Sequence, residues 1–482
     1  MQFSVVQRIL GLLIMVFSVT MLPPALVGLW YQDQSILPFI EGFLILLLSG
    51  FLVWFPVRTL RHELRLRDGF VIVVLFWAGL GVAGGVPLML SDQPQISVTD
   101  AVFESISGLT TTGATVITGL DTLPKSILFY RQLLQWLGGM GIIVLAVAIL
   151  PMLGVGGMQL YRAETPGPVK DSKLTPRITE TAKALWIIYL TLTVACMFAY
   201  WLAGMGAFDA LAHSFSTVAI GGFSTHDASI GYFDSPAIEG VAIFFMLISG
   251  VNFALHFFSW RALTFRNYWQ DSELRVYLAG IFATSFVVVL FLYLSNTTSL
   301  LFAIRQGVFQ TVSVATTTGF ATTNFSLWPV FIPVLLLLAS FVGGCAGSTG
   351  GGMKVIRVLL ILKQGMREVK RLVHPNATFI IKVGKKPLPD NVIEAVWGFF
   401  SAYVFVFVLI MLVMLATGMD QVTAFSSVAA SLNNLGPGLG DVATNYASIK
   451  DVEKWALCVA MLMGRLEIFT LLVIMSPAFW RR

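Results

Sequence analysis

This sequence is poor in charge and in cysteine. Only 11% of its 482 residues are charged while 57% are hydrophobic, so water would not solvate the folded chain and a lipid bilayer would. Its three cysteines, Cys196, Cys345 and Cys458, lie far apart without metal-type spacing, which excludes a disulfide framework and a cysteine metal site. The net charge of +5 is spread over short loops between hydrophobic runs, which argues against nucleic acid as a partner.

Apolar runs of roughly 20 residues, the length that crosses a ~30 Å hydrocarbon core, recur along the whole chain. Ten are expected to span the membrane: 8–30, 37–57, 69–91, 127–153, 183–205, 236–259, 275–295, 327–362, 392–417 and 453–477. Four shorter stretches, 98–112, 208–221, 303–318 and 420–435, are too short or too polar to cross. Each falls between two spanning segments. The first run lacks a convincing cleavage site and is expected to be retained.

The basic residues indicate an orientation. They gather in the segments 58–68, 154–182, 260–275 and 363–390, which the positive-inside rule assigns to the cytoplasm together with both termini. On the outer side remain only Lys125, Arg131, Arg305, Lys450 and Lys454. Acidic residues show the opposite bias and lie near the short stretches, where a negative mouth would concentrate cations. Randomly placed loop charges are the plainer alternative for some of them. The histidines His62, His226, His256 and His374 have no ligand spacing and are expected to be loop or packing residues.

The four short stretches end in similar sequences. These are SGLTTTGAT ending at Thr115, TVAIGGFST at Thr225, VATTTGFAT at Thr322 and SLNNLGPGL at Leu439, centred on Gly113, Gly222, Gly319 and Gly436. The glycines are 109, 97 and 117 residues apart, a length that suits two spans and a pore loop. Six residues before the glycine stand Ser107, Ser216, Ser313 and Ala430, and nine before it stand Glu104, His213, Gln310 and Ser427. The similarity therefore extends through the short helix.

Such a repeat predicts an ion pore. Non-helical backbone at membrane depth is tolerated only where protein buries it or water lines it, so four such loops most economically converge on one aqueous axis. Rings of backbone carbonyls replace the hydration shell of a small cation, and glycine lets carbonyls point inward because it reaches positive φ without penalty. A single TTTG sequence would be explained better by close packing between membrane helices than by a pore. Four copies in matching positions favour a pore. The expected filter residues are Thr111, Thr112, Gly113, Ile220, Gly221, Gly222, Thr317, Thr318, Gly319, Asn434, Leu435 and Gly436.

A glycine-rich run interrupts the hydrophobic segment 327–362. It comprises Gly343, Gly344, Cys345, Ala346, Gly347, Ser348, Thr349, Gly350, Gly351 and Gly352. Each glycine costs a helix about 1 kcal/mol relative to alanine, so we expect a loop in the middle of the membrane. A phosphate-binding loop is the competing interpretation, but GSTGGGMK lacks the Lys-Ser/Thr ending and no strand precedes it.

Arg465 is expected inside the last spanning segment, where an ionised side chain is costly and usually faces a cavity or a partner. One hypothesis is that it projects beneath the filter, touches the glycine-rich run and forms an electrostatic barrier to cations. The alternative is a structural arginine bonded to helix carbonyls.

With these motifs, the whole length of the sequence resembles the Trk/Ktr/HKT superfamily of potassium transporters, and the extra helix pair at 1–60 is similar to its TrkH branch. The resemblance implies an all-α integral membrane fold, with four pseudo-symmetric membrane-pore-membrane repeats around one pore plus two extra N-terminal helices. The repeats would be 69–153, 183–260, 275–365 and 391–478. Gly113 stands where serine is associated with sodium preference, so potassium is the implied ion. The fourth repeat departs most, through Asn434, Leu435 and Pro437.

The resemblance also implies potassium uptake across the bacterial inner membrane, with the glycine-rich run as an intramembrane gate. Potassium would be the substrate, held at the filter residues only, and no cofactor is expected in this chain. The implied partners are a cytosolic TrkA-type nucleotide-binding regulatory subunit, docking on 154–182 and 363–390, and a second copy in a homodimer. An alternative is a secondary transporter, a symport of potassium or another solute with protons or sodium, which parallel pore repeats disfavour. No acid-base or nucleophile constellation predicts an enzyme.

Overall fold

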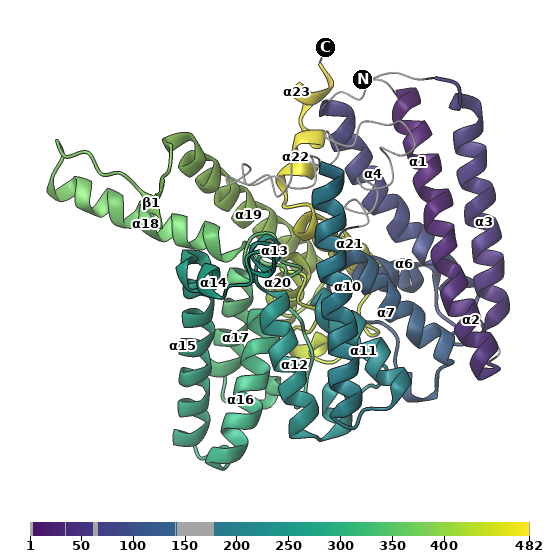
Figure 1. Ribbon diagram of the computed structural model, residues 1–482, viewed down its shortest axis with the longest axis horizontal. Coiled ribbons are helices and arrows are strands. Elements are labelled where there is room, and N and C mark those ends of the chain that lie inside the picture. Colours follow the sequence, from purple (N-terminus) through teal and green to yellow (C-terminus); the bar gives the residue numbers. More distant parts are fainter. Residues whose placement is uncertain are drawn as a thin grey trace.

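The computed structural model describes residues 3–33, 35–60, 66–139, 141, 178–384 and 386–481. Within them the chain is a bundle of helices with one antiparallel hairpin, β1 (Lys382–Val383) and β2 (Lys386–Pro387). Figure 1 shows both chain ends at the same end of the bundle. Arg67 at the start of the third span donates a 2.9 Å hydrogen bond to the Arg481 carbonyl and ties the C-terminal end there.

The helices follow the chain in five groups. The first holds α1 (Phe3–Ser18), η1 (Val19–Met21), α2 (Leu22–Tyr31), α3 (Ile36–Trp54) and η2 (Phe55–Val57). The second holds α4 (Leu66–Gly84), α5 (Val86–Leu90), α6 (Val98–Leu109), η3 (Leu120–Thr122) and α7 (Lys125–Gly139). The third holds α10 (Ile178–Leu202), α11 (Ala207–Ala219), η5 (Ser229–Phe233), α12 (Pro236–Ser249), α13 (Phe253–Arg261) and α14 (Arg266–Gln270).

Two further groups complete the bundle. One holds α15 (Ser272–Leu294), α16 (Leu300–Ala315), η6 (Phe325–Leu327), α17 (Phe331–Val342) and α18 (Val355–Val373). The last holds α19 (Asp390–Ala416), α20 (Gln421–Leu432), η7 (Gly440–Val442), α21 (Asp451–Arg465), α22 (Phe469–Met475) and α23 (Pro477–Trp480). The short helices α6, α11, α16 and α20 correspond to the four non-spanning stretches.

Small residues bring the N-terminal helices together. A Cβ added at Gly11 of α1 would lie only 2.8 Å from the carbonyl oxygen of Gly50 in α3. Backbones that approach this closely gain dispersion contacts that larger side chains would prevent, as is usual for helix packing in lipid. The helix pair 1–60 therefore packs as a unit, with α1 also lying against α4.

Six of the ten expected spans are continuous helical segments: Phe3–Tyr31, Ile36–Val57, Arg67–Leu90, Lys183–Leu202, Ser272–Leu294 and Asp390–Ala416. The expected span 127–153 begins as α7, and its second half lies outside the described residues, as does the loop 154–182 up to residue 177. The expected break within 327–362 is present, because α17 ends at Val342 and α18 begins at Val355.

The expected span 236–259 is bent, because α12 and α13 meet at 91°. The backbone groups freed at the bend bond the glycine-rich run. Gly250 accepts a 2.9 Å hydrogen bond from the Cys345 N–H, and the Phe253 N–H donates a 3.0 Å bond to the Gly347 carbonyl. This long-range pairing supplies the partners that a straight helix would have supplied locally.

The last expected span, 453–477, is also bent, by 113° between α21 and α22. Glu467 and Ile468 adopt φ of 53° and 56°, which is uncommon for residues other than glycine. Arg465 is consequently the last residue of α21 and not a mid-helix residue as the sequence suggested. The Glu467 carboxylate pairs with the guanidinium of Arg357 on α18, which holds the bend in place.

Candidate functional site

The four short helices end in the same backbone turn. The N–H groups of Thr112, Gly221, Thr318 and Leu435 each donate a 2.8 Å hydrogen bond to the carbonyl five residues earlier, at Ser107, Ser216, Ser313 and Ala430. Because the acceptor is a backbone oxygen, alanine serves as well as serine. The break in the sequence pattern at Ala430 therefore leaves the turn intact.

The twelve residues expected to form the filter share one backbone pattern. Thr111, Ile220, Thr317 and Asn434 have φ of 55°, 54°, 67° and 53°, and the glycines two residues later have φ of 81°, 81°, 84° and 96°. The residue between them stays at negative φ in every loop. Reversing the sign of φ at alternate residues turns successive peptide planes so that their carbonyls gather on one side of the chain, as a cation filter requires.

The four loops close into a ring. A Cβ added at any of the four glycines would collide with a carbonyl oxygen of the next loop: Gly113 with Gly221, Gly222 with Thr318, Gly319 with Leu435, and Gly436 with Thr112. The order runs from the first loop to the fourth and returns to the first. The loops therefore surround a common axis at one level, and only glycine fits where neighbouring loops touch.

Asn434 gives the fourth loop its own connections. Its amide donates 3.0 Å hydrogen bonds to the Thr112 hydroxyl of the first loop and to the Met461 carbonyl of α21. The neighbouring Asn433 donates to the Ser340 hydroxyl of α17 at 2.8 Å and accepts from Tyr403 of α19. The two asparagines thus replace the threonines of other loops without changing the backbone pattern, and they link the fourth loop to three helices.

Side chains of the short helices hold the chain just beyond each filter glycine. The Glu104 carboxylate accepts from the Val116 N–H at 2.9 Å, His213 bonds the Ser224 hydroxyl at 3.0 Å, and Gln310 donates to the Thr323 carbonyl at 3.1 Å. In the fourth loop Ser426, one residue before the equivalent position Ser427, accepts from the Leu439 N–H at 2.8 Å. The polar position nine residues before the glycine was the sequence signal for three of these anchors.

The glycine-rich run lies against the ring on the side where the short helices end. The Gly351 N–H donates a 2.7 Å hydrogen bond to the Thr317 hydroxyl, and the Gly352 N–H donates a 3.0 Å bond to the Asn433 carbonyl. The Thr349 hydroxyl donates to the Val218 carbonyl at 3.0 Å. These bonds reach the second, third and fourth short helices or their loops.

Arg465 makes the connection to the first loop. Its Nη1 donates to the Thr111 hydroxyl at 3.1 Å and to the Thr349 carbonyl at 3.3 Å. Its Nη2 donates to the carbonyls of Gly138 and Gly139 at the end of α7, the latter at 3.1 Å. The guanidinium therefore contacts the glycine-rich run and helix carbonyls together, so the contacts of both sequence hypotheses are present.

One acid that sequence reasoning missed bonds both the glycine-rich run and the helix that follows it. Glu273, in the first turn of α15, accepts from the Ala346 N–H at 2.7 Å and from the Ile356 N–H at 3.2 Å. The Lys354 ammonium donates to the Gly350 carbonyl within the run. No motif marks Glu273, because its role depends on a fold that brings α15 beside residues more than 70 positions away.

Three of the five cations expected on the outer side are paired with acids. Arg131 bonds Glu104 at 2.7 Å, Arg305 bonds both Asp234 and Glu239 at 2.8 Å, and Lys454 bonds Asp100 at 2.6 Å. Acids such as Asp92 and Asp441 lie exposed on the same loops. Charge at this end of the bundle is therefore left predominantly negative, which favours the approach of cations.

His226 joins the loops that follow the first two filter glycines. Its Nδ1 lies 2.5 Å from the Asp121 carboxylate and its Nε2 lies 3.7 Å from that of Asp209, while its ring stacks on Tyr232. Burial alone would lower the pKa of His226, but the nearby Asp209 carboxylate and the hydrogen bond to Asp121 raise it above its ordinary value. The expectation of a loop or packing histidine missed this ionic link.

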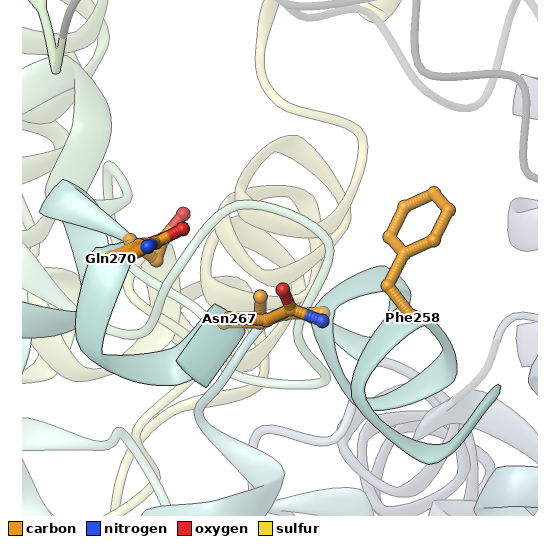
Figure 2. Close-up of a pocket in the computed structure, with 5 residues that line it drawn as sticks. Phe258, Asn267 and Gln270 are labelled. Carbon is orange, nitrogen blue, oxygen red and sulfur yellow. The ribbon is translucent and has the colours of Figure 1, made fainter. Parts of the chain in front are cut away.

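A shallow pocket of about 300 Å³ lies elsewhere, between α13 and α14. Figure 2 shows Phe258 from α13 and Asn267 and Gln270 from α14 around it, and Leu255 and Asp271 complete its lining. None of these residues belongs to the ring or to the glycine-rich run. Among the described residues there is also no cluster of three or more His, Cys, Asp or Glu side chains able to hold a metal ion.

Known proteins provide close comparisons. Residues 36–482 match the profile of the TrkH family, described as cation transport protein. The chain is 63% identical over 100% of both chains to the Trk system potassium uptake protein TrkH of Vibrio parahaemolyticus, and 42% identical to TrkG of Escherichia coli over 99% of this chain and 98% of the relative.

A solved structure agrees with this. The crystal structure of the potassium transporter TrkH from Vibrio parahaemolyticus superposes with a TM-score of 0.91 at 60% identity, covering 100% of both chains. The expectation of an all-α integral membrane protein is confirmed, and so is the expectation of a transport protein in place of an enzyme, because the relatives are named for potassium uptake.

The raised pKa of His226 predicts a pH effect on stability. Protonated His226 pairs with two carboxylates, so this contribution is complete below the ordinary histidine pKa of about 6.5 and is lost as pH rises through the raised value. We expect the melting temperature of the purified protein to fall across that range, and His226→Gln to remove this part of the fall. Because Asp121 is half-exposed, the effect should be about 1 kcal/mol or less. His374→Gln, at an exposed histidine, is the control; an unchanged pH profile for His226→Gln would contradict the assignment.

Proposed function

Because this chain belongs to the TrkH family of cation transport proteins, we propose that it takes up potassium ions through the ring of four loops. The closed ring is the observation that supports this proposal. Each of the four glycines has positive φ and lies against a backbone carbonyl oxygen of the next loop. Backbone carbonyls arranged in this way replace the hydration shell of a cation without binding it as strongly as a ring of carboxylates would. The names of the relatives, which are potassium uptake proteins, support potassium as the ion.

We propose that the twelve filter residues bind potassium as backbone ligands, and that potassium is a substrate with no cofactor in this chain. The four units 69–153, 183–260, 275–365 and 391–478 would each contribute one loop, with 1–60 as an added helix pair. The shared turn at the end of each short helix supports this division, because one hydrogen-bond pattern recurs four times. The negative charge at the ring's far end supports entry of cations from that side.

The glycine-rich run and Arg465 form the gate in this proposal. The run lies across the side of the ring where the short helices end and is bonded to three of its four segments, while Arg465 bonds the fourth. A guanidinium next to an ion path repels cations strongly where water is scarce. Opening this gate would break the bonds of the run to Thr317, Asn433 and Val218. Glu273 would still hold Ala346 in the run and Ile356 in the helix that follows it.

A coupled transporter is the second candidate. The bent pairs α12/α13 and α21/α22 are discontinuous helices beside the proposed path, a feature of secondary transporters that carry a solute with protons or sodium. The measurement that separates the two is the reversal potential of a planar bilayer. A potential set by the potassium gradient alone supports a channel, whereas one that shifts with pH or sodium requires symport.

We further propose that the protein sits in the bacterial inner membrane with both termini in the cytoplasm. Both termini lie at one end of the bundle (Figure 1). A cytosolic TrkA-type nucleotide-binding subunit would dock on that end, on 363–390 and on 154–182, the latter mostly outside the described residues. A potassium flux that does not respond to this purified subunit with any nucleotide would contradict the docking proposal.

A second copy of the chain would cover α18 in a homodimer. Leu362, Met366, Val369 and Val373 repeat at helical spacing along α18 and are all more than half exposed. Figure 1 shows α18 projecting from the bundle, so the other described parts of the chain leave this stripe uncovered. An isologous contact along it would bury the stripes of two copies against each other.

The filter proposal predicts the effect of Gly113→Ser. A serine side chain would collide with Gly221 of the next loop and disturb the ring, so sodium should pass more readily relative to potassium, by about tenfold, or ~1.4 kcal/mol of lost discrimination. Reversal potentials of the reconstituted protein under mixed ions measure this ratio. Gly119→Ser is the matched control, since Gly119 also has positive φ, at 73°, but its Cβ would meet only Thr122 at 3.7 Å. Equal selectivity of Gly113→Ser and wild type would refute the filter assignment.

The gate proposal predicts that Arg465→Ala raises potassium flux in liposomes when no activating partner is present. Removing the guanidinium removes the charge barrier and the bond to Thr349. Arg465→Lys keeps the charge without the planar fork, so its flux should stay near that of the wild type. If Arg465→Ala is folded and conducts as slowly as the wild type, the barrier does not exist.

The homodimer proposal predicts cross-linking through Met366→Cys. The native cysteines Cys196, Cys345 and Cys458 are buried, so oxidation in detergent should link only the new residue across a two-fold axis and double the apparent mass. Leu301→Cys, an exposed position at the start of α16, should stay monomeric. Equal cross-linking of both variants would indicate random collision and remove support for the α18 contact.

A further inference from the structure

Arg131 is a fully buried arginine close to the mouth of the ring. It extends from α7, and its three nitrogens bond three separate segments. Nε donates to Glu104 of the first short helix at 2.7 Å, Nη2 to the Thr115 hydroxyl at 3.1 Å, and Nη1 to the Ser224 carbonyl at 3.0 Å. Thr115 and Ser224 each stand two residues after a filter glycine, in adjacent loops. One guanidinium therefore fixes the exits of two neighbouring filter loops.

Glu104 completes the arrangement from the other side. Both of its carboxylate oxygens accept from the Thr115 hydroxyl, at 3.0 and 3.1 Å, and one of them also accepts from the Val116 N–H at 2.9 Å. Neither Arg131 nor Glu104 is exposed, so solvent does not screen the pair. A buried pair with all its hydrogen bonds made holds its geometry firmly, whereas one with a missing partner leaves an uncompensated charge.

The bonds continue into the second loop. The Ser224 hydroxyl bonds His213 of the second short helix at 3.0 Å, so Glu104, Arg131, Ser224 and His213 form one chain of contacts across two segments. The Arg131 guanidinium also lies 4.3 Å above the ring of Phe223, the residue next to the filter glycine Gly222.

A second residue of α7 acts on the same loop. Gln135, one helical turn after Arg131, donates to the Gly221 carbonyl at 2.5 Å and accepts from the Phe223 N–H at 3.0 Å. Residues four apart share a helix face, so α7 presents Arg131 and Gln135 together to the second filter loop. This face of α7 therefore bonds the second loop at Gly221, in the proposed filter, and at Phe223 and Ser224 just after it.

The other anchors lack an ion pair. His213 and Gln310 hold their loops through neutral bonds, and Ser426 holds the fourth loop through its hydroxyl. Of these four anchors, only Glu104 is connected to the adjacent loop through a charged group, the Arg131 guanidinium. The ring is therefore stiffened unequally, most at the contact between the first and second loops.

We infer that Arg131 is a positioning residue that sets the separation of the first and second filter loops, and through it the discrimination between potassium and smaller cations. The inference rests on the proposed potassium function. Arg131 does not itself bind the ion and acts through the two loops that it bonds. Its planar fork holds three acceptors in fixed directions, which a lysine ammonium on a flexible stem does not reproduce.

The experiment compares Arg131→Lys with wild type in proteoliposomes made with the full chain. We expect Arg131→Lys to keep the buried charge next to Glu104 but to lose the bonds that span the loops, and to lower the potassium-to-sodium permeability ratio by roughly tenfold. Reversal potentials measure the ratio independently of the amount of active protein, which a purely structural role would change instead. Arg131→Lys that folds and discriminates as wild type does would overturn the inference.

Arg305→Lys is the matched control. Arg305 also pairs with acids, Glu239 and Asp234, but its bonds do not reach the filter loops or the residues directly after the glycines, so selectivity should stay unchanged. If Arg131→Lys fails to fold, Thr115→Val removes a single hydroxyl of the same network and should shift the ratio in the same direction by a smaller factor. An unshifted ratio in a folded Thr115→Val would then refute the inference.

The two levels of the proposal fail differently. A wild-type protein that does not prefer potassium over sodium would defeat the proposed function itself. A potassium-selective wild type whose selectivity survives in folded Arg131→Lys would defeat only the role of Arg131.

Discussion

The structure depends on the need to satisfy backbone polar groups at membrane depth, where no water replaces a missing partner. Four loops leave the helical pattern there, and each solves the problem with the same 2.8 Å bond back to its own short helix. The remaining freedom is removed by the neighbouring loop, which touches the glycine directly. The bend between α12 and α13 obeys the same rule, because its exposed groups bond the glycine-rich run. Loop, bend and ring are therefore solutions to one constraint.

The sequence predicted those features that depend on composition and local conformational preference. The glycines at the centres of the loops and the break after Val342 follow from the properties of glycine alone, and the apolar runs follow from their length. The bends were missed. The turn at Glu467 and Ile468 uses positive φ at residues that give no local signal, and it is stabilised by Arg357, more than 100 positions away. Such features depend on tertiary contacts, which no local pattern contains.

The candidate site also contains features that the sequence predicted and features that it did not. The twelve residues expected to form the filter were found from a recurring motif, and even the divergent fourth copy keeps the backbone conformation of the others. The residues that hold the motif in place were not predictable, because each occurs once. Arg131 and Gln135 share α7 with another polar residue, Gln132, and Glu273 lies in the first turn of α15. Sequence inspection alone does not separate them from solvent-facing residues. A buried charge inside an apolar helix does show where to look for a distant partner.

The ring of glycine contacts has a consequence for how the protein can change. In a channel assembled from four identical subunits, any substitution near the axis occurs four times at once. Here all four loops belong to one chain, so a substitution alters only one of the four loops. Because each loop contacts only its two neighbours through the glycines, the direct effect of the substitution is limited to those neighbours. In the proposed filter, ion preference can thus change in small steps during evolution. The asparagines of the fourth loop show that one loop can diverge in its side chains while it keeps the backbone conformation of the others.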